Sequence, residues 1–173
     1  NDFLNDGFVN LISFWDKDEI QLFLETFLDL LKMQSQKLGL ELNSKHDNFY
    51  DELDSTAIQL NQYDPDALDF VIQMLERTKP AKKISQNDRF TQTVSKILGC
   101  EEKRLLIDGP QILVNFPQNK TRLYTWHTES NWYPKRRNFV NTWSPLVRPK
   151  TKDSGTLYVI KKSHKKKWDF CEC

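Results

Sequence analysis

His127 and Glu129 stand two residues apart in a segment rich in β-favouring side chains. In a strand, residues i and i+2 project from the same face, so this imidazole and this carboxylate can hold one divalent metal ion together. A mononuclear non-haem iron(II) centre needs two imidazoles and one carboxylate, and keeps its remaining positions for a cosubstrate and oxygen. The pair therefore offers two of three ligands. An H-x-E triplet alone also arises by chance, and a structural role for His127 stays open at this point.

The elements that must position this pair divide the chain into a helical part and a strand-like part. The spacing of apolar side chains predicts four helices: from the cap Asp16 to near Gly39, from Asp47 to about Asn61, from Asp64-Pro65 to a break at Pro80, and from about Asn87 to Gly99. Short runs bounded by turn residues predict strands at 8–12, 105–107, 111–116, 122–127, 138–146 and 155–161. Helices first and strands afterwards predict an α+β fold, with helices bracing one side of a sandwich or jelly roll.

Composition limits the classes of protein to which the chain can belong. With 173 residues and 38% hydrophobic side chains, we expect one domain, 1–173, in which 1–99 is mainly helical support and 100–173 is the first part of the jelly roll. A net charge of +1 argues against a nucleic-acid or membrane partner. The three cysteines resemble neither a disulfide framework nor a zinc site. No apolar run approaches the roughly 20 residues of a membrane span, and we expect a cytoplasmic protein.

Four ordered blocks carry a resemblance to a known family. They are Trp126-His127-Thr128-Glu129 with Tyr133-Pro134, Trp143-Ser144-Pro145-Leu146, Ser154-Gly155-Thr156-Leu157 and Ser163-His164-Lys165, and Asp6-Gly7-Phe8-Val9 adds a fifth near the start. This series resembles the phytanoyl-CoA dioxygenase family of iron(II)- and 2-oxoglutarate-dependent oxygenases. The resemblance implies a cupin-like double-stranded β-helix (jelly roll), an iron cofactor, 2-oxoglutarate as cosubstrate, and O₂ with a small molecule as substrates.

The resemblance also assigns the metal ligands. It makes His127 and Glu129 two of them, although the family usually has aspartate at the second position. The family's distal histidine and its 2-oxoglutarate-binding arginine lie beyond the Ser-His block, where this sequence ends. His164 matches the Ser-His turn and His46 lies in the helical half, so neither is assigned to the metal. We expect either a fragment lacking the distal residues or a degenerate relative with an incomplete site.

The cosubstrate pocket is expected near the metal pair. Similarity suggests that Trp143 and Ile112 line it. Asn141 lies two residues from Trp143 on the same strand face and can donate a hydrogen bond there. Core packing by Trp143 and a backbone partner for Asn141 are the alternatives.

The substrate is expected near the polar residues that follow the ligand pair. Asn131 and Tyr133 follow the ligands and can face it. Arg136, in a basic loop with its two neighbours, can bind a phosphate or carboxylate group. Packing of Tyr133 on Pro134 and a solvated loop are the alternatives. A second basic cluster, 161–167, surrounds a family turn, so RNA binding is not expected there.

Three functions remain open. The first is a dioxygenase that hydroxylates a polar or anionic metabolite. The second is a catalytically inactive jelly-roll protein that binds or scaffolds without a complete metal triad. The third is a metal-dependent cupin-like enzyme that does not use 2-oxoglutarate. The sequence leaves the substrate and the oligomeric state undetermined.

Overall fold

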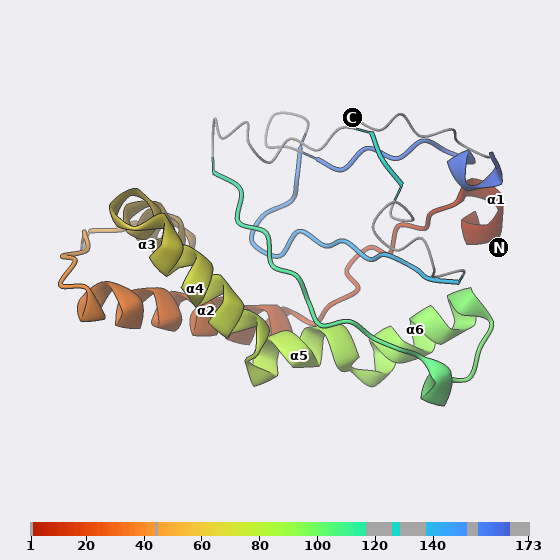
Figure 1. Ribbon diagram of the computed structural model, residues 1–173, viewed down its shortest axis with the longest axis horizontal. Coiled ribbons are helices and arrows are strands. Elements are labelled where there is room, and N and C mark those ends of the chain that lie inside the picture. The colour runs from red at the N-terminus through yellow and green to blue at the C-terminus, as the bar shows by residue number, and fades with distance from the viewer. Residues whose placement is uncertain (1, 44, 117–125, 129–137, 152–155, 167–173) are drawn as a thin grey trace. The chain divides into compact units, whose positions relative to one another are not determined.

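The computed structural model describes residues 2–43, 45–116, 126–128, 138–151 and 156–166 (Figure 1). The chain divides into two compact units. The larger unit is Trp15–Arg148, and the smaller unit combines Asn1–Phe14 with Pro149–Cys173.

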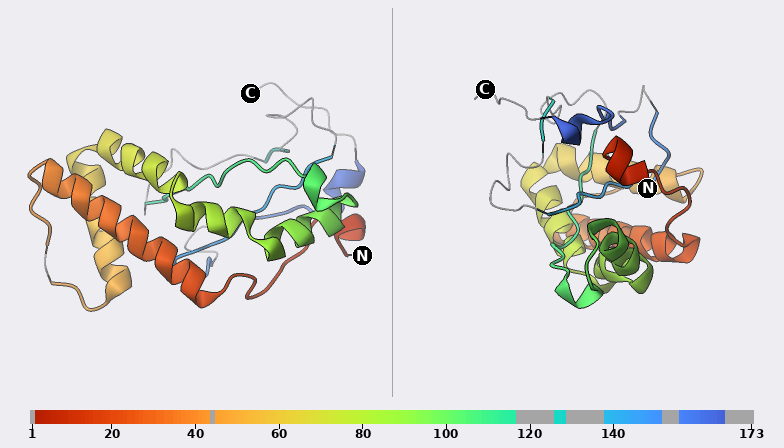
Figure 2. Two further views of the ribbon diagram at one scale, coloured as in Figure 1. Left: turned by 90° about the horizontal axis from the view of Figure 1, so that it is seen from below. Right: turned by 90° about the vertical axis from the view of Figure 1, so that its right-hand side faces the viewer.

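Helices make up the body of the larger unit. They are α2 (Lys17–Lys37), α3 (Phe49–Tyr63), α4 (Pro65–Glu76), α5 (Lys79–Gln86) and α6 (Asp88–Leu98), followed by a short 3-10 turn, η1 (Glu102–Arg104). Helix α2 packs against α3, α4 and α5, and α3 packs against α4 (Figures 1 and 2). The long α2 is therefore the central element of this helical layer. No helix in the described part of the chain is long and apolar enough to cross a membrane.

The core lies between these helices and is aliphatic and aromatic. Its most buried large side chains are Leu24, Leu31, Leu53, Leu60 and Leu75, each at most 2% exposed. They come from α2, α3 and α4, where apolar residues recur every three or four positions. Burying each leucine stabilises the fold by about 1.5–3 kcal/mol, so this interface is the main source of stability in the unit.

Side-chain caps explain why most of the helices begin where the sequence predicts. The Oδ1 atoms of Asn48, Asp64 and Asn87 accept hydrogen bonds from backbone N–H groups in the first turns of α3, α4 and α6. At the other end of α6, Gly99 adopts a left-handed conformation with φ of +66°. The expected helices of the first hundred residues are present.

The sequence predicts a break at Pro80, whereas the structure has helix α5 there. Pro80 instead lies in the first turn of α5, where the missing N–H has no helical partner to lose. The Oγ1 atom of Thr78 caps this turn by accepting a hydrogen bond from the N–H of Ala81 at 3.3 Å. The proline therefore starts a helix here.

The prediction of an α+β jelly roll is wrong. Within the described residues no strand and no sheet is formed, and the ordered secondary structure is helical. Residues 111–116 do show the predicted alternation: Ile112, Val114 and Phe116 pack on the helical core, while Leu113 is 53% exposed. Alternation of apolar and polar side chains indicates only that one face of an extended chain is buried. Here helices bury that face, and no backbone ladder follows from it.

The other expected strands follow the same correction where they are described. Residues 8–12, 105–107, 138–146 and 156–160 are without strand structure, and most of 122–127 lies outside the described residues. In the first of these runs Ile12 is 85% exposed. β-branched composition therefore did not bring these segments into a sheet.

The smaller unit is held together by bonds between α1 (Asp2–Asp6) and a 3-10 turn, η4 (Ser163–Lys165). The backbone N–H of Lys162 donates to the Asp6 carbonyl at 2.7 Å, and the Lys161 ammonium lies 2.8 Å from the Asp6 carboxylate. The hydrogen bond from Lys161 lowers the pKa of Asp6 below its ordinary value. His164 Nε2 lies 3.0 Å from the Leu4 carbonyl.

Candidate functional site

The predicted metal pair is only partly within the described residues. His127 belongs to the short stretch 126–128, where it is exposed beside Trp126, which is 68% exposed. Glu129 lies outside the described residues, as do Asn131, Tyr133 and Arg136. The roles of these side chains stay predictions.

The donor chemistry of the described residues is incomplete for an iron centre. Nowhere in the described ranges do three His, Cys, Asp or Glu side chains come together as a metal-binding group. An imidazole such as that of His127 is a suitable iron ligand, but the described residues do not complete a triad around it.

The two other histidines have local bonds of their own. His46 Nε2 lies 2.6 Å from the Asn43 carbonyl oxygen in the loop between α2 and α3. His164 Nε2 lies 3.0 Å from the Leu4 carbonyl in the smaller unit. Because a carbonyl oxygen only accepts, both rings donate through Nε2.

The segment that carries Asn141 and Trp143 is anchored on the helical body. Trp15 stacks on Phe90, with ring centroids 5.8 Å apart, and its Nε1–H donates to Ser144 Oγ at 3.1 Å. Two residues further on, the side chains of 146–147 pack against the core. Trp143 is 48% exposed and Asn141 is exposed, so this segment buries residues 146–147 more fully than Trp143.

Arg148, at the end of this segment, is bound to α3 by ion pairs. Its guanidinium hydrogen-bonds the Asp54 carboxylate and lies 3.6 Å from the Asp51 carboxylate, both on α3. The hydrogen bond to Asp54 raises the pKa of Arg148 above its ordinary value. Two carboxylates of one helix therefore fix the end of the segment.

Ile112, the other residue predicted to line the cosubstrate pocket, lies against the helices. Its backbone N–H donates to Glu76 Oε1 at 2.9 Å, at the end of α4. Its side chain is partly buried against the hydrophobic core. The contacts that fix Ile112 are thus to the helical body, and its role toward a cosubstrate is untested.

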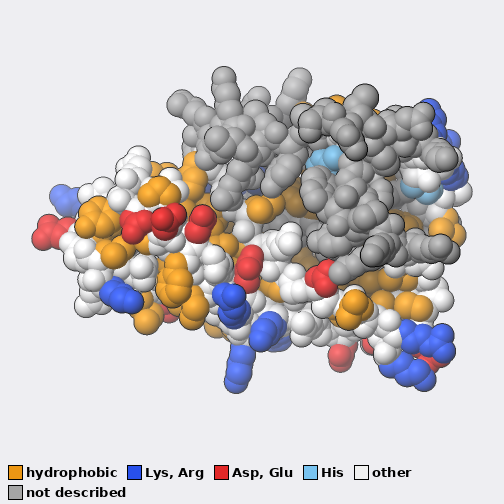
Figure 3. Space-filling view, in the orientation of Figure 1, with side chains coloured by type: hydrophobic (Ala, Val, Ile, Leu, Met, Phe, Trp, Pro, Cys, Tyr) orange, Lys and Arg blue, Asp and Glu red, His pale blue; other side chains and the backbone are white. Residues whose placement is uncertain are grey.

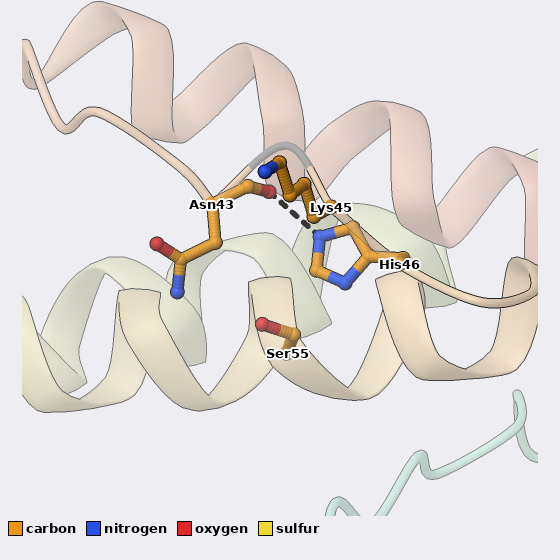
Figure 4. A pocket seen from close by; sticks show the side chains of 4 residues that line it. All are labelled: Asn43, Lys45, His46 and Ser55. Atoms are coloured by element: carbon orange, nitrogen blue, oxygen red, sulfur yellow. Dashed lines mark hydrogen bonds between the residues drawn. The ribbon is translucent and has the colours of Figure 1, made fainter.

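Two pockets lie elsewhere on the larger unit, and none of the predicted site residues within the described ranges lines them. One is polar, has a volume of about 360 Å³ and is lined by Asn43, Lys45, His46 and Ser55 (Figure 4). The other, of about 220 Å³, lies between α2 and α4 and includes Met33, Phe70 and Met74. Sequence reasoning missed the polar pocket, although the polar run Asn43 to Asn48 between two helices was a signal for it.

Surface charge gives no single-sign face over the visible helices. Figure 3 shows Lys and Arg side chains interspersed with Asp and Glu side chains on this face. A mixed cluster of charges joins α2 to α6: Arg89 binds both carboxylate oxygens of Asp16, at 3.2 and 2.7 Å, and lies 3.3 Å from Glu19. The hydrogen bond from Arg89 lowers the pKa of Asp16. Asp16 therefore serves as an ion-pair partner, and its side chain makes no capping bond to α2.

Comparison with known proteins identifies a family. The family model described as Phytanoyl-CoA dioxygenase (PhyH) matches residues 3–170, which confirms the resemblance carried by the sequence blocks. Neither the curated proteins nor the solved structures gave a match. The matched range contains every predicted site residue.

Proposed function

The chain belongs to the phytanoyl-CoA dioxygenase family, and from this membership we propose that it is an iron(II)- and 2-oxoglutarate-dependent dioxygenase that hydroxylates a polar or anionic metabolite. The family implies an oxygenase of this type. The observation that carries the proposal is the family match over 3–170, which includes the His127-x-Glu129 block.

In this proposal the chain's residues bind and orient the reactants. His127 and Glu129 provide an imidazole and a carboxylate to iron(II), which with 2-oxoglutarate would activate O₂ for hydroxylation. Trp143, Ile112 and Asn141 shape the cosubstrate side of the site, where exclusion of water and fixed orientation favour reaction. The anchoring of Ser144 and Arg148 on the helices supports such a fixed position for Trp143.

The polar character of the substrate rests on three further residues. Asn131 and Tyr133 offer hydrogen bonds, and Arg136 offers a charge for a phosphate or carboxylate. Apolar acyl chains would find little complementarity in these side chains.

Anaerobic titration with iron(II) and 2-oxoglutarate tests the proposal. A working site is expected to give a weak visible charge-transfer band, which His127→Ala and Glu129→Ala should each abolish while the far-UV circular dichroism keeps its helical signal. His46→Ala is the matched control, because this half-buried histidine lies in the α2–α3 loop, away from the sequence block of the predicted ligands. An unchanged band in either ligand variant would reject the assignment.

A second candidate is a binding or scaffold protein without oxygenase activity. The observation in its favour is that the described residues assemble no three-donor group. The same titration separates the two, since a scaffold would give no band and release no succinate. Metal-dependent turnover without succinate would instead indicate an enzyme that does not use 2-oxoglutarate.

A further inference from the structure

The polar pocket between the α2–α3 loop and the second turn of α3 has the composition of an oxyanion site. Its lining side chains are those of Asn43, Lys45, His46 and Ser55. Each can donate a hydrogen bond, and none is acidic. The volume of about 360 Å³ exceeds that of several water molecules at about 30 Å³ each, so a tetrahedral oxyanion fits.

Gln59 of α3 holds the two sides of this pocket together. Its Nε2 donates to Ser55 Oγ at 2.8 Å, and its Oε1 accepts from the backbone N–H of Asn43 at 3.2 Å. The loop is thereby tied to the helix. Because Ser55 Oγ accepts from Gln59, its own proton can be donated to a ligand.

His46 adds a nitrogen that suits phosphate in particular. Nε2 donates to the Asn43 carbonyl at 2.6 Å, and Figure 4 shows the other ring nitrogen on the side turned toward α3. That nitrogen accepts a hydrogen bond in the neutral ring and donates one in the imidazolium. A phosphate monoanion carries both P–O⁻ acceptors and a P–OH donor, so it matches either state. An ionised carboxylate only accepts.

The negative charge of Asp54, which would repel an anion, is partly neutralised by an ion pair. Asp54, next in sequence to Ser55, is paired with Arg148, which it shares with Asp51. Lys45 is exposed and contributes the one formal positive charge of the lining. Among the lining side chains themselves the formal charge is therefore positive, which favours a negative ligand.

We propose that this pocket binds a phosphate group, with Lys45, Ser55 and Asn43 donating to its oxygens and His46 fixing its orientation. The group belongs either to free phosphate or to a phosphorylated metabolite. The proposal does not rest on the proposed iron centre, because none of the predicted iron or cosubstrate residues that the structure describes lines this pocket.

Calorimetric titration of the whole chain at constant ionic strength tests the site, with inorganic phosphate and, separately, glycerol 3-phosphate as probes. Lys45→Ala is expected to raise the Kd for phosphate about tenfold, which is the effect of losing one charge-assisted hydrogen bond. Lys96→Ala is the matched control: it removes the same charge from an exposed position of α6 and should change the Kd by less than about twofold. The His46 ring signals in NMR should shift on binding.

The outcomes separate the sources of phosphate. Binding of inorganic phosphate alone assigns the site to free phosphate, binding of the ester alone assigns it to a metabolite, and binding of both assigns it to the shared group. Absence of saturable binding of both probes at about millimolar concentration would overturn the proposal. So would equal weakening by Lys45→Ala and Lys96→Ala. Neither result depends on iron loading.

Discussion

Replacing Gly7 by alanine is expected to destabilise the smaller unit by about 2 kcal/mol. Gly7 follows α1 with φ of +86°, a conformation that disfavours side chains. A Cβ added there would lie 2.3 Å from Nδ1 of His164, which is too close for any real contact. The ring would have to move, and in moving it would lose its bond to the Leu4 carbonyl.

The expected loss of stability in Gly7→Ala has two contributions, one from backbone strain and one from the lost His164 contact. Left-handed backbone costs alanine about 1–2 kcal/mol, partly offset by about 0.4–1 kcal/mol from the reduced entropy of the unfolded chain. Loss of the His164 hydrogen bond adds about 1 kcal/mol. The backbone part should recur at Gly39, where φ is +68° and nothing lies within 4 Å of an added Cβ. Gly39→Ala is therefore the matched control, with an expected loss of about 1 kcal/mol.

Hydrogen exchange measures each loss locally. The Lys162 amide, bonded to the Asp6 carbonyl, reports on Gly7→Ala, and the Leu40 amide, bonded to the Ser35 carbonyl, reports on Gly39→Ala. Protection at Lys162 should fall about 30-fold, against about fivefold at Leu40. In a His164→Ala background the extra loss at position 7 should vanish, since the clashing ring is gone. Equal losses at the two glycines, or an excess that persists without the ring, would refute the argument.

Three further perturbations test other parts of the structure. Leu31→Ala is expected to lower the free energy of unfolding by about 2–5 kcal/mol because Leu31 is fully buried, whereas Met33→Ala, at 65% exposure on the same helix, should change it by less than about 0.5 kcal/mol in urea denaturation. Arg89→Met should destabilise the protein at neutral pH. Because the pKa of Asp16 is lowered by the hydrogen bond from Arg89, this stabilisation is present above the ordinary carboxyl value of 3.8 and is lost as the pH falls through the lowered one, so the difference from the wild type should shrink in acid urea titrations. Trp143→Ala should weaken 2-oxoglutarate binding in anaerobic titrations with little loss of stability, since Trp143 is 48% exposed; a large loss of stability with unchanged affinity would instead assign it to packing.

The helices could be predicted from the sequence because their signals are local. Asn48, Asp64 and Asn87 each cap a helix through bonds to residues two or three positions away, so a short window contains both partners. Pro80 misled the prediction for a related reason. Its effect depends on whether it falls in the first turn, which the Thr78 cap decides.

The strand predictions failed because strand formation needs a distant partner, which a local pattern does not identify. The alternating run 111–116 is buried on one face, as its pattern indicates, but it lies on helices. The sequence of a six-residue run does not determine whether a sheet or a helical layer will cover its apolar face. The contacts that anchor the candidate site also depend on distant partners. Trp15 hydrogen-bonds Ser144, and Arg148 hydrogen-bonds Asp54, across long stretches of sequence, so no local motif predicted either contact.

The blocks that resemble the family do not all serve one purpose. Asp6-Gly7 and Ser163-His164-Lys165 are far apart in sequence, yet they form one structural cluster, in which Lys162 bonds Asp6 and the His164 ring occupies the space that a side chain at position 7 would need. A glycine at position 7 is thus explained by packing against His164. Because packing within the smaller unit accounts for these two blocks, the metal binding implied by the resemblance rests on the His127 and Glu129 block. Variants of the terminal cluster should therefore change local stability without changing iron affinity, and a loss of iron binding in Gly7→Ala with its fold retained would show that this separation is wrong.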